Sequence, residues 1–146
     1  MPRTSRPRSA HVALLDTGPL VAFFVRRDPD HRRVVQFLRG FSGRLLTTWP
    51  VLAEVCHFLE PKVAVGFLRW IEQGGASLVE LPPEDLPAVA ALMERYADRP
   101  MDLADATLVW IGGQLGIGDV LTLDRGDFQT YRLPDGSPFR DLLAPA

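Results

Sequence analysis

The sequence has little with which to build covalent cross-links or a membrane anchor. Cys56 is the only cysteine, so no disulfide can form within the chain. No apolar run approaches the ~20 residues that a membrane-spanning helix requires, and the stretch over residues 20–25 is too short. The arginine-rich residues 3–8 resemble the start of a secretory signal, but Asp16 interrupts the apolar residues that follow. We therefore expect a cytoplasmic protein held together by its core.

Lysine is also nearly absent, because Lys62 is the only one and arginine supplies the other positive charges. The formal net charge of -2 gives no basic field over the whole chain. Arginine pairs with phosphate groups in a bidentate geometry, which would suit an RNA ligand. Genomic base composition explains the same imbalance, and residue usage alone does not locate a phosphate site. The arginine content therefore leaves both explanations open.

The chain is long enough for one domain with a real core, since 146 residues with 47% hydrophobic content need no disulfides. Residues 1–10 are rich in proline, arginine and serine and are expected to form a flexible lead-in, with a single domain over 11–146. Strands are predicted over 12–15, 44–47, 76–81 and 120–123, with a short edge strand over 131–133. Helices are predicted over 19–25, 30–39, 50–60, 61–73, 82–97, 102–115 and 125–129.

Strands and helices alternate along the whole chain, and no hairpin signal separates two strands. This pattern predicts a three-layer α/β/α fold with a mainly parallel central sheet of about four to five strands. The handedness of the crossover connections then brings the carboxyl ends of the strands to one edge of the sheet.

Five acidic residues fall where that edge is expected. Asp16 follows the first predicted strand and Asp124 follows the fourth, and open α/β sheets bind ligands at this edge. Asp102 and Asp105 are three residues apart at the start of a helix, which places their side chains on one face. Glu54 lies among apolar neighbours and needs a partner. The five carboxylates can converge on one metal-binding cleft.

Each acid also has a purely structural explanation. Asp102 and Asp105 complement a helix dipole, an interaction worth roughly 0.3–1 kcal/mol. Asp16 and Asp124 can cap the helices that follow them, and Glu54 can pair with an arginine. All five explanations would have to hold at once for the cleft to disappear, so the joint pattern favours a metal site. We interpret the nearby residue 127 as a turn or cap residue.

Four segments together carry a family resemblance. They are Leu14–Leu20, the helix around Glu54, Met101–Ala106 and Leu121–Phe128. In this order and at this spacing they resemble the PIN-domain ribonucleases, and in particular the VapC-type toxins of type II toxin–antitoxin systems. The resemblance covers residues 11–133.

The resemblance implies an endoribonuclease that depends on Mg²⁺ or Mn²⁺. It matches Asp16, Glu54, Asp105 and Asp124 to the acidic quartet of the family, and Asp102 to a frequent additional acid. It also implies a cognate antitoxin protein that occludes the cleft, an RNA substrate and a homodimer.

The chemistry suits these residue types, because Mg²⁺ and Mn²⁺ are hard cations that choose carboxylate oxygens. We hypothesise that Asp16, Asp105 and Asp124 hold the metal and that a water attacks the RNA phosphodiester in line, with a second ion at the leaving oxygen. Glu54 and Asp102 would orient water around the ion.

Further residues are expected around this centre. Thr17 and Thr122 are candidates to hydrogen-bond the ligating carboxylates. Arg26, Arg27 and Arg125 are candidates to contact RNA phosphates, although a plain surface position at a strand end is the stronger explanation for Arg125.

Two rival functions come from other classes. A phosphatase or phospho-acceptor domain also places an aspartate after its first strand. The phosphatase class expects a second aspartate two residues later, where this chain has Gly18, and both classes need a late lysine that is missing here. The second rival is a PIN-like module that binds RNA or protein without cutting. Such a module would be recognised by the loss of one of the five acids, and this chain retains all of them.

Overall fold

A parallel sheet organises the computed structural model, which describes residues 11–99 and 101–145 of the 146. The strands are β1 (Val12–Leu15), β2 (Arg44–Thr47), β3 (Ser77–Leu78), β4 (Asp119–Leu121) and β5 (Arg140–Asp141). They pair in the order β3-β2-β1-β4-β5, and every pairing is parallel. The lead-in expected over residues 1–10 lies outside the described residues.

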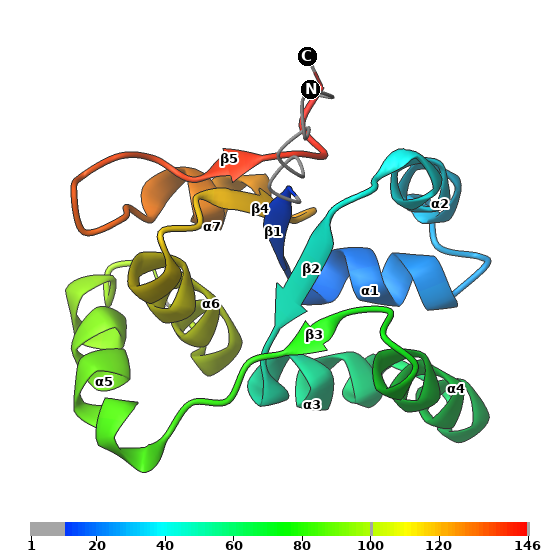
Figure 1. Ribbon diagram of the computed structural model, residues 1–146, viewed down its shortest axis with the longest axis horizontal. Coiled ribbons are helices and arrows are strands. Elements are labelled where there is room, and N and C mark those ends of the chain that lie inside the picture. The colour runs from blue at the N-terminus through cyan, green and yellow to red at the C-terminus, as the bar shows by residue number, and fades with distance from the viewer. Residues whose placement is uncertain (1–10, 100, 146) are drawn as a thin grey trace, which may run out of the picture.

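Helices cover both faces of this sheet. They are α1 (Thr17–Phe24), α2 (His31–Gly40), α3 (Trp49–Phe58), α4 (Pro61–Glu72), α5 (Leu86–Arg95), α6 (Leu103–Leu115) and α7 (Arg125–Thr130), with the 3-10 turn η1 at Pro83–Asp85. Figure 1 shows α1 and α2 to the right of the strands and α5 and α6 to the left, while α3 contacts both α1 and α6. The predicted three-layer α/β/α fold is confirmed. Within the described ranges, no helix is long and apolar enough to cross a bilayer.

The order of the strands places a crevice beside β1. The chain moves outward from β1 to β2 and β3, then returns to add β4 and β5 on the other side of β1. In open α/β sheets, ligands bind where the direction of winding reverses, outside the carboxyl ends of the strands. Here that point lies between the ends of β1 and β4. The backbone N–H of Asp16 donates to the carbonyl of Leu121 at 3.0 Å, which joins the two strand ends.

The edge strand predicted over residues 131–133 is wrong. Arg132 forms only an isolated antiparallel bridge with Pro138, because the chain reverses through a turn in which Gly136 has a φ of 86°. The edge position belongs to β5, whose Arg140 N–H donates to the carbonyl of Gly118 at 2.8 Å. A two-residue strand of charged side chains carries no hydrophobic alternation, so its composition did not reveal it. The strand predicted over 76–81 is also shorter, with β3 limited to Ser77–Leu78.

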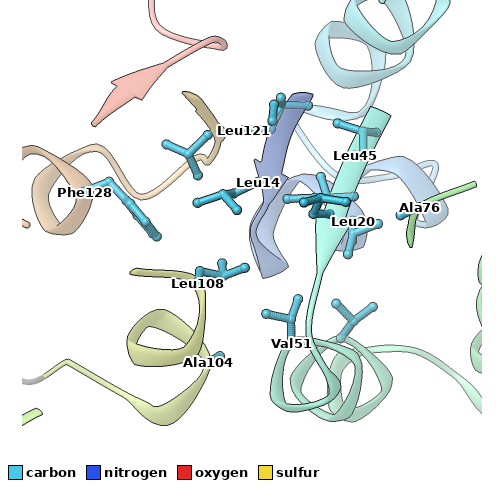
Figure 2. Packing of buried hydrophobic residues seen from close by; sticks show 14 of the residues in the cluster. Leu14, Leu20, Leu45, Val51, Ala76, Ala104, Leu108, Leu121 and Phe128 are labelled. Carbon is cyan, nitrogen blue, oxygen red and sulfur yellow. The ribbon is translucent and has the colours of Figure 1, made fainter. Parts of the chain in front are cut away.

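Apolar side chains fill the spaces on both sides of the sheet. Figure 2 shows Leu14, Leu108, Leu121 and Phe128 pointing toward one another between the strands and α6. On the other face, the side chains of Leu20, Leu45 and Ala76 lie together. Because β1 is buried on both faces, its sequence is a continuous apolar run without alternation.

Gly112 lies where α6 packs against β1, at a position with no room for a side chain. A Cβ atom at Gly112 would lie 2.9 Å from the carbonyl oxygen of Ile117 and 3.1 Å from Cδ1 of Leu14. The helix ends at Gly116, whose φ of 68° is a left-handed conformation that favours glycine. The close approach brings the first turn of α6 to the carboxyl end of β1, where the acidic residues gather.

The substitution Leu108→Ala should lower the free energy of unfolding by about 2–5 kcal/mol, because it leaves a cavity in the core between α6 and the sheet. Leu115→Ala is the matched control, since Leu115 ends the same helix with 54% of its surface exposed. This control should cost less than about 1 kcal/mol. Urea unfolding monitored by circular dichroism measures both, and equal losses would contradict this description of the core.

Candidate active site

Asp16 is a buried carboxylate at the point where β1 passes into α1. It is the N-cap residue of α1, but its side chain makes no capping hydrogen bond, so the purely structural explanation for Asp16 does not hold. Instead, the Thr122 hydroxyl donates to its Oδ2 at 2.8 Å. Only 5% of the surface of Asp16 is exposed. This burial is the main cause that raises the pKa of Asp16 to about 6. Asp102 and Glu54 add electrostatic repulsion, while hydrogen bonds from the backbone N–H of Thr17 and from the Thr122 hydroxyl oppose the rise.

Asp102 and Asp105 lie in the first turn of α6, as their spacing predicts. Asp102 caps the helix by accepting a hydrogen bond from the Asp105 N–H at 2.8 Å, a structural role in addition to the dipole interaction expected of it. Asp105 is buried and accepts from the Tyr131 hydroxyl at 3.0 Å. Burial, followed by the negative charges of Asp16 and Asp102, raises the pKa of Asp105 to about 8. The helix dipole alone does not account for a buried carboxyl with this environment.

The segment after β4 supplies two more acids. The Asp124 N–H donates to the Thr122 hydroxyl at 3.0 Å, so one threonine side chain contacts both Asp16 and Asp124, which lies three residues past the end of β4. The carboxyl groups of Asp124 and Asp127 share a hydrogen bond, and this contact is the main cause that raises the pKa of Asp127 to about 6. Asp127 is therefore more than the turn residue that its sequence context indicated.

Glu54 projects from the middle of α3 toward the same acids. Burial and the neighbouring Asp102 raise its pKa, and a side-chain hydrogen bond with Asp102 adds to the effect. The alternative in which Glu54 pairs with an arginine finds no support among the described residues, where the ion pairs involve only Asp30 and Asp119 as acids. Its partners are other carboxyl groups.

These side chains line one cavity of about 500 Å³ at the carboxyl edge of the sheet. The lining consists of Asp16, Thr17, Gly18, Val21, Asp28, Glu54, Phe58, Asp102, Asp105, Leu123, Asp124 and Asp127. Of the described residues, no lysine, arginine or histidine lines it. All five predicted acids are present, and the sequence analysis missed two further members, Asp28 and Asp127. Asp127 follows Asp124 at the same spacing of three that had singled out Asp102 and Asp105, so this signal was available.

The predicted arginines have different positions. Arg26 and Arg27 are exposed in the loop after α1, and Arg26 lines a neighbouring cavity instead of the acidic one. Arg125 begins α7, but its side chain lies outside what the structure describes. The analysis missed Arg99, whose charge lowers the pKa of Asp127 and whose side chain donates to the carbonyl of Gly126 at 3.3 Å.

The donor set of the cavity fits a hard divalent cation. All its charged groups are carboxylates, and no cationic side chain among the described residues lines it to compensate their charge. The Thr17 hydroxyl is buried at the wall of this cavity and has no hydrogen-bond partner, although we expected it to contact a carboxylate. Within the described part of the chain, no three acidic, histidine or cysteine side chains converge tightly enough to hold one ion. Direct ligation by Asp16, Asp105 and Asp124 stays a prediction that requires side-chain rotation.

Fold and site together define a class of protein. It is a three-layer α/β/α domain with an acidic cavity where the winding of the sheet reverses direction. The family model described as PIN domain matches residues 13–132, so the chain belongs to the PIN domain family. The resemblance that the four segments carry is thereby confirmed.

Two similar proteins are VapC proteins. The chain is 27% identical over 130 residues to Ribonuclease VapC26 of Mycobacterium tuberculosis (strain ATCC 25618 / H37Rv), covering 86% of this chain and 96% of that protein. The structure of the present chain is similar to the crystal structure of Mycobacterium tuberculosis VapC20, which is described as a Sarcin-Ricin loop cleaving toxin. That match has a TM-score of 0.72 and 17% sequence identity, and it covers 79% of this chain and 91% of the other.

The raised pKa values of the cleft predict how stability depends on pH. In metal-free protein, the folded state binds protons to Asp16 and Asp105 more tightly than the unfolded chain does, so their contribution is complete below about pH 4 and is lost as the pH rises through about 6 and 8. The free energy of unfolding in EDTA should therefore decrease as the pH rises from about 5 to 8. The titration of Asp105 should account for a decrease on the order of 3 kcal/mol.

Asp105→Asn mimics the protonated carboxyl, and its amide oxygen can still accept from Tyr131. This variant should show a shallower fall with pH, whereas Asp98→Asn, an exposed change outside the cavity, should keep the wild-type slope. Urea titrations at several pH values measure the slopes. The same slope in Asp105→Asn as in the wild type would contradict the assigned environment.

Proposed function

We propose that this chain is a divalent-metal-dependent endoribonuclease that hydrolyses RNA phosphodiester bonds and acts as the toxin of a toxin–antitoxin pair. The observation that carries the proposal is the set of seven carboxylates around one cavity at the switch point of a PIN domain. The similar proteins are described as a ribonuclease and as a Sarcin-Ricin loop cleaving toxin, and these descriptions support the same activity. All five acids that the family resemblance assigns to the site line this cavity, which supports an enzyme over a silent binding module.

In this proposal, Asp16, Asp105 and Asp124 hold Mg²⁺ or Mn²⁺, while Glu54 and Asp102 orient water from the side of α3 and the cap of α6. When bound, such an ion polarises a phosphoryl oxygen and provides a nucleophilic water near neutral pH. Asp124 is exposed, and its carboxylate forms no ion pair with a basic side chain among the described residues. It is therefore free to rotate toward the carboxylates of Asp16 and Asp105.

The surrounding side chains keep two of these carboxylates in place. Thr122 holds Oδ2 of Asp16, and Tyr131 holds Oδ2 of Asp105. Because the pKa of Asp105 is raised to about 8, its carboxyl carries a proton at neutral pH and must lose it when a cation binds. Cation binding at pH 7 should therefore release protons and become tighter as the pH rises.

The backbone of the RNA needs positive charge near the acids. Arg26, Arg27 and Arg125 remain our proposed phosphate contacts, and Arg99 joins them because it lies close enough to Asp127 to influence its pKa. Each would help to offset the repulsion between the phosphates and the carboxylates of the cleft.

Partners and location belong to the proposal as well. A cognate antitoxin would cover the cleft and restrain the nuclease in the cytoplasm, where the RNA substrate is found. A homodimer is supported by the exposed apolar side chains of Trp49, Leu86 and Leu103, which surround a groove of about 310 Å³ between α3, α5 and α6.

The activity test uses a mixed RNA pool incubated with purified protein and Mn²⁺, Mg²⁺ or EDTA. Asp16→Asn keeps the shape of the side chain but removes a charge from the proposed metal site, so the cleavage rate should fall by about 100-fold or more. Asp135→Asn is the matched control, since Asp135 is exposed in a turn outside the cavity, and it should cut at the wild-type rate.

Gel electrophoresis of the RNA reads the result. Equal cutting by Asp16→Asn and the wild type, or cutting that persists in EDTA, would overturn the metal-dependent mechanism. If the wild type binds the pool but leaves it intact under every condition, the binding-only module becomes the better description.

A further inference from the structure

A second cavity, of about 600 Å³, lies behind α1 and opens between α1, α2, α4 and the start of β2. Figure 1 shows these elements together at the right of the molecule. The residues of its lining that carry chemistry are Phe23, Arg26, His31, Arg39, Phe41 and Trp70. In contrast to the acidic cavity, no aspartate or glutamate among the described residues lines it.

Positive charge is concentrated around this cavity and only partly compensated. The segment from Arg26 to Arg39 contains five of the 16 basic residues of the chain and only two acids. Arg26 and Arg39 are exposed, and neither takes part in an ion pair within the described residues. Two free guanidinium groups beside a cavity without carboxylates favour an anionic ligand, and their planar geometry suits phosphate.

His31 is held in one orientation. Its Nδ1 donates to the carbonyl of Ala22 at 2.7 Å, which leaves Nε2 as the ring nitrogen free to contact a ligand. The histidine thus adds a fixed polar group to the same wall as Arg26 and Arg39.

Aromatic rings form the rest of the wall. The ring of Phe41 stacks on Phe37 with centroids 5.5 Å apart, and Phe23 lies against Trp70 at 5.6 Å. Phe23, Phe41 and Trp70 are all half-buried, so parts of their rings remain accessible. Rings of this kind stack on nucleobases irrespective of sequence, because every base has a π-face.

The two cavities share a wall made by α1 and the loop after it. Val21 and Asp28 line the acidic cavity, whereas Phe23 and Arg26 line the second one. Asp16 directly precedes α1, and Arg26 lies just past its end, so at about 1.5 Å per helical residue the two are separated by roughly 15 Å. A single RNA strand can span this distance with a few nucleotides.

We propose that this second cavity is a nucleotide subsite, which binds a phosphate and a base of the RNA a few nucleotides away from the bond that is cut. Arg26 and Arg39 contact the phosphate, and the rings of Phe41 and Trp70 receive the base. The inference rests on the proposed ribonuclease function and identifies part of its substrate-binding surface.

The test measures RNA binding separately from cutting. A fluorescein-labelled, single-stranded RNA dodecamer is titrated with full-length Arg26→Gln/Arg39→Gln protein in EDTA, and fluorescence anisotropy gives the dissociation constant at several salt concentrations. We expect affinity to fall by about tenfold or more. The slope of log K against log salt should become shallower by about 1.4, as expected for two lost phosphate contacts on a single strand.

Lys62→Gln/Arg95→Gln is the matched control, because it removes two exposed charges outside this cavity. It should bind RNA nearly as the wild type does, and circular dichroism checks that both variants are folded. In cleavage assays with Mn²⁺, the arginine variant should need more protein than the control variant for half-maximal cutting.

The outcomes separate this inference from the nuclease proposal. If the arginine variant binds RNA as tightly as the control, with the same salt slope, the subsite does not exist, even if the wild type cuts RNA. Loss of binding to a partner protein with unchanged RNA binding would also overturn it. If the wild type cuts no RNA but the arginine variant alone loses RNA binding, the subsite stands and the nuclease proposal fails.

Discussion

Repulsion among carboxylates at the ends of β1, β4 and the first turn of α6 is the constraint on which the arrangement of this site depends. Burial raises the pKa of Asp16 to about 6, and burial together with its acidic neighbours raises that of Asp105 to about 8. Such a cluster opposes folding at neutral pH unless something favours the charged forms. A divalent cation has this effect, since it attracts the carboxylates and displaces their protons. The electrostatics of the site therefore point to the ligand that the proposed activity requires.

The scaffold keeps the acids close despite this repulsion. A parallel sheet buried on both faces fixes the end of β1, and Gly112 lets α6 approach it closely enough to bring in Asp105. Single hydrogen bonds then orient the carboxyl groups, from Thr122 to Asp16 and from Tyr131 to Asp105. Beyond α1, the charge changes sign from an acidic cavity to a basic one, an arrangement that suits a ligand with phosphates on both sides of the reacting bond.

Most of the fold and the members of the acidic cavity could be predicted from local sequence. Asp16 follows an apolar run that is buried on both faces, so the strand end was visible in the chain. Contacts between distant segments were not visible. Tyr131 was expected in a strand but contacts Asp105, and Asp28 reaches the cavity only because the loop after α1 folds toward it. The second cavity draws its lining from residues spread over 23–75, and no local pattern marks such a set.

The most direct test of the central claim is to locate the metal in crystals grown with Mn²⁺, by its anomalous scattering. We expect a peak within the acidic cavity, with oxygen atoms of Asp16, Asp105 and Asp124 at bonding distance or linked through one water. The peak should disappear in crystals of Asp16→Asn. A peak held by other side chains, or an empty cavity at saturating Mn²⁺, would contradict the claim that these carboxylates form a metal centre.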